Sequence, residues 1–482
     1  MPPCCVTGSS SCGARERRSK VDTRNKTNFG TGSIPKHMAR MALPLIAAQL
    51  VNVLYNIVDR VYIGHIQGIG YMALTGVGIA LPVITVVSAF AGLCGQGGAP
   101  LCSIARGRGD TEEASRVIGN ALTLLLLASA TVMAVCLVFL KPILWAFGAS
   151  EGTMPYAAGY LRIYLYGTPL VFISLGMNVY INAQGFATKG MLTVIIGAVA
   201  NIVLDPIFIF LFKMGVEGAA LATVIAQGIS ALWCFSFLRG KKTPLELSLR
   251  TMKLRGKTVK GILALGVADF IVGITNSAIQ TVANKMLGIY GGDLYIGAAT
   301  VLFSLRTIPM EIIRGMSAGF APVMGFNYGA GLKARVLKSI RCSAFAGLVF
   351  SILVWLLFMT LPEPLIRLFT TDEELIRVAI PAVRIYFCGF VFMTLQFIAQ
   401  NCFRALGKAR ESTIFSLFRK IVLVVPLTLL LPGVFGMGVN GVYWSEPISD
   451  IVGGAASFTT VMLTVYRPMA KQLKEEEKLC QS

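Results

Sequence analysis

Long apolar stretches recur along the whole chain, and they restrict its fold more than any other feature. Met41–Val58 and Val117–Leu140, for example, contain no charged residue. A helix that crosses the roughly 30 Å hydrocarbon core of a bilayer needs about 20 such residues. The stretches are continuous rather than alternating, so they fit helices and not the strands of an outer-membrane barrel. Twelve candidate spans fit the chain, at residues 40–64, 73–103, 116–140, 154–182, 188–212, 216–238, 259–288, 296–326, 338–361, 378–403, 411–435 and 440–466.

The composition agrees with a membrane protein and disfavours several other classes. Hydrophobic residues make up 55% of the chain and charged residues 14%, whereas a soluble domain carries about 25% charged residues. A soluble enzyme, a disordered scaffold and a secreted disulfide module are therefore disfavoured. The chain has eleven cysteines, none in CxxC spacing, and two histidines. We expect neither a disulfide framework nor a zinc site.

The net charge of +20 predicts the topology. Of the 43 Lys and Arg residues, 31 fall in the terminal segments and the even-numbered connectors, and four fall in the odd-numbered connectors. This is the positive-inside pattern, so we expect a multi-pass protein of the cell membrane with both termini cytoplasmic. The same pattern disfavours nucleic acid as a partner.

The chain also contains an internal repeat. At a constant offset of 222 residues, Ala99-Pro100 matches Ala321-Pro322, and Arg162-Ile163-Tyr164 matches Arg384-Ile385-Tyr386. Both halves start inside and hold six spans, which predicts an all-α membrane fold of two pseudo-symmetric six-helix lobes around a midplane cavity. Secondary transporters have this architecture. The alternative is a duplicated membrane protein without transport function.

Domain boundaries follow from the spans and the polar segments. Residues 1–38 are rich in Gly, Ser, Lys and Arg and lack the apolar core of a signal peptide. We expect a disordered cytoplasmic tail at 1–38, a first lobe at 39–240, a cytoplasmic linker at 241–258, a second lobe at 259–467 and a cytoplasmic C-terminal tail at 468–482.

Acidic residues inside membrane spans are costly and usually functional. This chain has six: Asp59, Asp205, Asp269, Glu311, Glu446 and Asp450. Asp59 and Asp205 lie about 19 and about 17 residues from the cytoplasmic ends of their spans, which places both in the outer third of the bilayer at 1.5 Å per residue. Asn201 shares a helix face with Asp205, and Thr223 lies at similar depth.

These four side chains predict an ion site in the first lobe. Two carboxylates, an amide and a hydroxyl form an all-oxygen site for a hard cation, or a carboxylate pair that holds a proton. The alternative is a structural hydrogen-bond network. The second lobe has no twin of Asp205, because Val425 occupies the matching position.

In the second lobe, Glu446 and Asp450 share a face of the last span, and Glu311 has an arginine three residues later. Cavity lining and buried pairing are equal alternatives for these acids, and Asp269 lies nearer the inner end. The first span carries polar residues on one side, which face a cavity or another helix. They are Gln49, Asn52, Tyr55, Asn56 and Asp59.

Three segments resemble the multidrug and toxic compound extrusion family, in its MepA-like branch. They are Tyr55–Gly64, Asn201–Pro206 and Gly319–Gly331, and the likeness extends over roughly residues 36–468. The resemblance implies a twelve-helix antiporter that expels organic cations in exchange for H⁺ or Na⁺, as a monomer and without a cofactor.

The resemblance also implies roles for particular residues. Asp59, Asn201, Asp205 and Thr223 would carry the ion coupling and would hold Na⁺ where sodium is the ion. Tyr160 would join that network, and Pro44 would be the bend of the first helix. The expected substrate cavity comprises Gln49, Asn52, Tyr55, Asn56, Asn178, Glu311, Glu446 and Asp450.

Three rival functions stay open at this point. A lipid-linked saccharide flippase of the related two-lobe fold would need a cationic cavity, for which the chain offers Arg306, Arg314, Arg384, Arg419 and Lys420. An intramembrane enzyme is disfavoured because the chain has no HExxH motif, and its two histidines leave few groups for acid–base chemistry. A receptor or scaffold without transport would bind ligand regardless of ion gradients.

Overall fold

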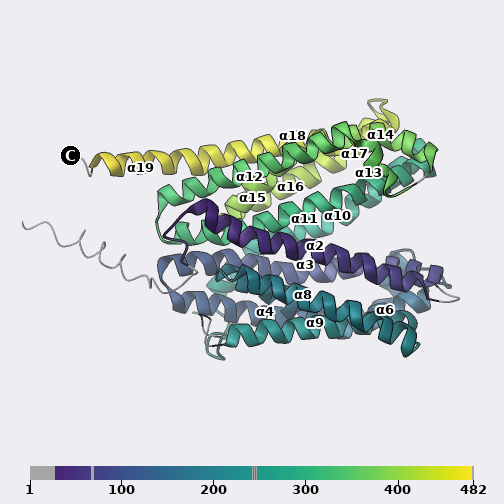
Figure 1. Ribbon diagram of the computed structural model, residues 1–482, viewed down its shortest axis with the longest axis horizontal. Helices are drawn as coiled ribbons and strands as arrows, with labels where there is room; N and C mark the ends of the chain where they lie inside the picture. Colours follow the sequence, from purple (N-terminus) through teal and green to yellow (C-terminus); the bar gives the residue numbers. More distant parts are fainter. Residues whose placement is uncertain are drawn as a thin grey trace, which may run out of the picture.

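The computed structural model describes residues 28–66, 70–240, 243, 245, 247–370 and 372–479. Every regular element within these residues is helical. Figure 1 shows two elongated helical bundles, one formed by the purple-to-teal first half of the chain and the other by the green-to-yellow second half. This confirms the predicted all-α, two-lobe architecture.

The first lobe is built on the predicted apolar spans, with large side chains such as Phe172 and Tyr180 fully buried in its core. Its elements are α2 (Ile34–Gly64), α3 (Gly70–Arg108), α4 (Thr111–Val138), α5 (Leu140–Ala146), α6 (Met154–Tyr166), α7 (Thr168–Ala183), α8 (Ala187–Pro206), the π-helical segment η1 (Ile207–Leu211) and α9 (Gly215–Arg239). Helices α6 and α7 are bent by 60° where they meet at Gly167, and together they form one span.

The second lobe repeats this plan around its own core, which includes Phe358 and Phe387 with stacked rings 3.9 Å apart. Its elements are α10 (Gly256–Gly291), α11 (Asp293–Gly329), α12 (Lys333–Thr360), α13 (Pro362–Arg367), α14 (Glu373–Phe387), α15 (Phe390–Ala405), α16 (Ala409–Leu417), η2 (Phe418–Val424), α17 (Val425–Gly433), α18 (Gly438–Val461), η3 (Met462–Tyr466) and α19 (Arg467–Leu479). The bent pair α14 and α15, at 43°, matches the α6–α7 pair of the first lobe.

The membrane spans can be counted within the described residues. Nine helices are long and apolar enough to cross a bilayer, and the number rises to eleven when each bent pair is taken as one span. The remaining predicted span corresponds to α10, which has 36 residues.

The predicted disordered tail needs a correction at its end. Residues 1–27 lie outside the described ranges, but residues 28–38 are ordered, and α2 already begins at Ile34. Phe29, Ile34 and Met38 are buried because they pack against α11, where the ring of Phe29 meets that of Phe326 edge to face at 5.8 Å. Because these apolar residues pack against α11, the first helix begins within the segment that was predicted to be disordered.

The two lobes meet through glycines at the helix ends next to the predicted cytoplasmic connectors. A Cβ atom at Gly97 of α3 would lie 2.1 Å from the carbonyl oxygen of Ile262 on α10. On α11, a Cβ at Gly319 would lie 2.5 Å from the backbone of Ala42, and one at Gly329 would lie 2.0 Å from the carbonyl oxygen of Ile104. The backbones of the two lobes can approach this closely only because these positions lack side chains.

We therefore predict that Gly97→Ala destabilises the protein by about 1–3 kcal/mol, because the added methyl group overpacks the α3–α10 crossing. The measurement is the thermal unfolding midpoint of the purified protein. Gly92→Ala on the same helix is the matched control, since a Cβ there meets nothing within 4 Å. Equal midpoints for the two variants would contradict this prediction.

Candidate functional site

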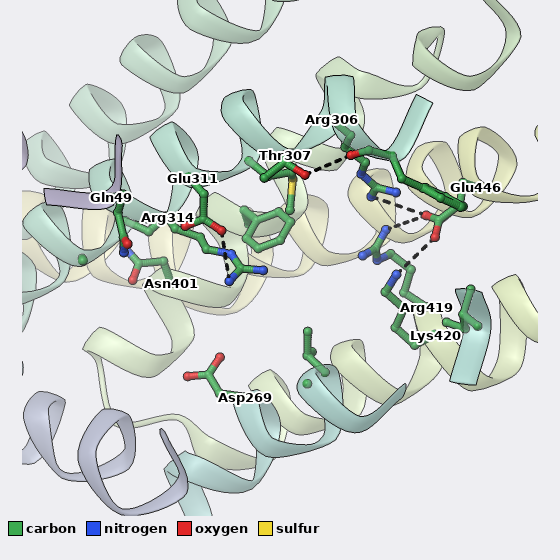
Figure 2. A pocket seen from close by; sticks show the side chains of 18 of the residues that line it. Gln49, Asp269, Arg306, Thr307, Glu311, Arg314, Asn401, Arg419, Lys420 and Glu446 are labelled. Atoms are coloured by element: carbon green, nitrogen blue, oxygen red, sulfur yellow. Dashed lines mark hydrogen bonds and ion pairs between the residues drawn. The ribbon is translucent and has the colours of Figure 1, made fainter. Parts of the chain in front are cut away.

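A cavity of about 650 Å³ lies between the lobes and extends into the second lobe. The first lobe contributes an uncharged wall from α2, α3 and α7, with Gln49, Gln96, Ser103 and Asn182 as its polar side chains. The second lobe contributes all the charged lining residues and most of the apolar ones, including Leu302, Phe303, Met310 and Phe397. Figure 2 shows the labelled charged side chains around this space.

The residues predicted to form the first-lobe ion site come together inside the first lobe and are not among those that line the cavity. The Asn201 amide donates a hydrogen bond to Asp205 Oδ1 at 3.0 Å and another to Thr223 Oγ1 at 3.4 Å. Asp205 is fully buried, and Asn201 is 2% exposed. Asn201 and Asp205 lie one turn apart on α8, and Thr223 faces them from α9.

Helices α2 and α6 complete this group. The Asp59 carboxyl lies within electrostatic and hydrogen-bonding reach of the Asp205 carboxyl. Tyr160 lies within reach of both Asp59 and Thr223. Asp59, Tyr160, Asn201, Asp205 and Thr223 are called the first-lobe network below.

The chemistry of the first-lobe network suits a proton or a single hard cation. Two facing carboxyl groups form a hydrogen bond only when one of them is protonated, and otherwise they need a cation between them. Among the described residues, no group donates a hydrogen bond to Asn201 Oδ1 or Asp205 Oδ2, although both atoms are buried. No set of three or more His, Cys, Asp or Glu side chains in the described part of the chain could hold a metal ion.

The polar stripe on α2 divides between different surroundings. Gln49 lines the cavity. Tyr55 faces the carboxyl groups of Asp59 and Asp205. Asn56 is exposed and donates to the backbone carbonyl oxygen of Asn52 at 2.6 Å, and neither side chain is among those that line the cavity.

Two residues that the family resemblance suggested can also be placed. Pro44 lies inside α2, which continues through it without a break. Asn178 is close to Gly190 of α8 and does not line the cavity, whereas Asn182, one turn further along α7, does. The sequence analysis missed Asn182, although its helical spacing from Asn178 was a signal that could have indicated it.

The acids of the second lobe lie in ion pairs. Glu446 on α18 lies 3.4 Å from Arg419 Nη1, 3.2 Å from Lys420 Nζ and 3.6 Å from Arg306 Nη2. Asp450, one turn further, is paired with Arg419. Figure 2 shows Arg306 reaching Glu446 from one side of the cavity and Arg419 and Lys420 from the other. These five residues are called the second-lobe cluster below.

The sequence left two alternatives open for these acids, cavity lining and buried pairing, and both occur in the second-lobe cluster. Glu446 lines the cavity and is also paired, whereas Asp450 is paired behind the cavity wall. Arg306 is further held by the Tyr386 hydroxyl and lies over the Tyr386 ring at 5.4 Å. The π-helical segment η2 presents the neighbouring residues Arg419 and Lys420 to the same carboxylate, and such segments often occur at functional sites.

Two further ion pairs line the cavity. Glu311 and Arg314 on α11 lie 3.4 Å apart, at the spacing that the sequence indicated. Asp269 on α10 is paired with Arg404 on α15, a contact that sequence reasoning missed because the two residues are 135 positions apart. By the predicted limits, Arg404 lies just beyond the span at 378–403.

Comparisons with known proteins agree with this arrangement. The family model MatE matches residues 44–207 and 270–430, which is more than half of the chain. The chain is 26% identical to the multidrug export protein MepA of Staphylococcus haemolyticus, over 88% of this chain and 92% of that protein. It is 24% identical to MepA of Staphylococcus aureus strain MRSA252, over 90% and 95% of the two chains.

The fold is shared with solved structures. A crystal structure of a MATE protein in the bent conformation superposes with a TM-score of 0.87 at 23% identity, covering 94% of this chain and 99% of the other. The family match, the relatives and the shared fold together settle the class of protein. The chain belongs to the MatE (multidrug and toxic compound extrusion) family and is a membrane transporter rather than an enzyme.

Proposed function

We propose that this transporter exports small organic molecules in exchange for inward H⁺ or Na⁺. The observation that carries the proposal is the first-lobe network, in which two carboxyl groups face each other beside an amide and two hydroxyl groups. A buried carboxyl pair gains free energy by taking up a proton or a cation. Related proteins named multidrug export proteins support the direction of transport.

The driving force is sufficient for such export. One elementary charge that moves inward across 100 mV releases about 2.3 kcal/mol. At 1.4 kcal/mol per ten-fold change, this supports a concentration ratio of about forty to fifty for a neutral solute. The ion shifts the conformational equilibrium only by its different affinity for the two states.

Helix α2 is the physical link between ion and cavity in this proposal. It carries Asp59 in the first-lobe network, and it packs its backbone at Ala42 and Ile46 against Gly319 and Gly315 of the other lobe. Occupation of the network would shift α2 and so change the contact between the lobes. Pro44 lies between the inter-lobe contacts, where a helix bends most easily.

The orientation follows the charge pattern. With both termini cytoplasmic, the glycine contacts between the lobes close the cytoplasmic side of the cavity, and the conformation is the one that receives ions from outside. The protein would act as a monomer in the cell membrane, with the lipid bilayer as its surroundings and no cofactor.

Organic cations are the first substrates to test. Asp269, Glu311 and Glu446 face the cavity, and the rings of Phe303 and Tyr386 can contact a delocalised cation. A lipid-linked saccharide flippase stays the second candidate, and five cationic side chains on the cavity wall favour it: Arg306, Arg314, Arg404, Arg419 and Lys420. Transport of a pyrophosphate-linked lipid in vesicles, without efflux of organic dyes, would support that candidate.

We predict that Asp59→Asn and Asp205→Asn abolish efflux of a cationic dye, because neither variant can form the carboxyl pair. Both variants should still insert in the membrane, since an amide costs less than a carboxylate in the bilayer. The measurement is dye efflux from cells, with the amount of inserted protein determined in parallel. Asp372→Asn is the control, because Asp372 caps α14 outside the network and asparagine caps a helix equally well. Efflux at the wild-type rate by either network variant would contradict the proposal.

A further prediction concerns the identity of the coupling ion. Proteoliposomes with a pH gradient or a Na⁺ gradient, imposed separately, should accumulate dye under one of the two. Asn201→Leu should lower the affinity for Na⁺ if sodium is the ion, because it removes one oxygen ligand, and should change proton-driven transport much less. Transport that proceeds equally without either gradient would reject antiport.

A further inference from the structure

The second-lobe cluster holds more positive than negative charge. Among the described residues, Arg306, Arg419 and Lys420 pair with two carboxylates, Glu446 and Asp450. The five side chains are between 5% and 13% exposed, so water screens this excess poorly. An unbalanced cation at the wall of a cavity is costly unless a ligand or water completes it.

Hydrogen-bond donors are also in excess. A lysine ammonium has three N–H donors, and the one partner of Lys420 among the described residues is Glu446 Oε1 at 3.2 Å. An arginine has five N–H donors, and every side-chain hydrogen bond of Arg419 to a described residue is donated by Nη1. Both residues line the cavity, so their remaining donors are available to a bound molecule.

The rest of the cavity wall does not reverse this excess. The charged lining residues are five cations and three acids. Each of the acids already contacts an arginine or lysine: Asp269 contacts Arg404, Glu311 contacts Arg314, and Glu446 contacts the cluster. An organic cation would therefore compete with arginine for every carboxylate, whereas an anion would find open donors.

We propose that the second-lobe cluster binds the carboxylate, phosphate or sulfonate group of an amphiphilic substrate, with Lys420 and Arg419 as the donors. The apolar body of that substrate would lie along Leu302, Phe303 and Phe397, which line the same cavity. The inference rests on the proposed function in taking this cavity as the substrate site, and it extends the substrate class to anions and zwitterions.

The test compares two dyes that differ in one group. Rhodamine 110 carries a free carboxylate, and rhodamine 123 is its methyl ester. Binding to the purified full-length protein in detergent is measured by fluorescence anisotropy. Lys420→Gln removes the excess positive charge of the second-lobe cluster. It should weaken rhodamine 110 binding about ten-fold, which is the effect of losing one charge-assisted hydrogen bond. It should leave rhodamine 123 binding within two-fold of the wild type.

The opposite substitution guards against misfolding as an explanation. Glu446→Gln raises the excess positive charge and should strengthen rhodamine 110 binding several-fold, a gain that a misfolded protein cannot give. Lys420→Arg keeps the charge and should retain most of the rhodamine 110 affinity. Lys338→Gln, at an exposed position on α12, is the neutral control. Equal loss of both dyes in Lys420→Gln, or no gain in Glu446→Gln, would overturn the proposal.

Two more experiments are needed. One distinguishes a soluble amphiphile from a lipid headgroup as the source of the anionic group, and the other tests this inference separately from the efflux proposal. In nanodiscs, an unchanged rhodamine 110 affinity when phosphatidylglycerol is added supports a soluble amphiphile, whereas competition that depends on Lys420 assigns the same subsite to a lipid headgroup. Binding that depends on Lys420, without transport of either dye in proteoliposomes, would keep this inference and reject the efflux proposal. Transport of both dyes at rates that Lys420→Gln leaves unchanged would keep the efflux proposal and reject this inference.

Discussion

Charged and polar groups inside a bilayer must find their partners within the protein, and this requirement organises the molecule. Lipid offers no hydrogen bonds, so isolated charges in a span are costly. The first lobe meets the requirement by placing two carboxyl groups beside an amide and hydroxyls. The second lobe meets it in part, by pairing two carboxylates with three cations whose excess positive charge lies at the cavity wall. Where the lobes meet, their helices approach closely at glycines such as Gly97, Gly319 and Gly329.

The two lobes share one plan and yet carry opposite chemistry. The repeat reproduces the spans, the bent helix pairs and the Ala-Pro steps, but Val425 replaces the carboxylate where Asp205 would recur. The acidic first-lobe network lies away from the cavity, whereas four of the five residues of the second-lobe cluster line it. A transporter with this division would separate the coupling ion from the substrate, and the two could influence each other only through movement of the lobes.

The sequence predicts how deep a residue lies in the membrane much better than it predicts the direction in which the side chain points around the helix axis. Hydropathy predicts the spans, and the i,i+4 and i,i+3 spacings predict the Asn201–Asp205 and Glu311–Arg314 contacts. Pairs such as Asp269 and Arg404 depend on how distant helices are rotated against each other, which no local pattern contains. The same uncertainty explains Asn56, which shares a polar stripe with Gln49 but bonds to its own helix instead of lining the cavity.

Two of the basic residues that the topology prediction counts also help to hold the lobes together. Arg335 at the start of α12 donates hydrogen bonds to the carbonyl oxygens of Phe29, Thr31 and Gly32, ahead of α2. Arg106 of α3 donates to the carbonyl oxygen of Ala183 and lies over the Phe326 ring of the other lobe. Each such hydrogen bond contributes only about 0.5–3 kcal/mol. Lobes that separate at this end, as the proposed transport cycle requires, would have to break these contacts.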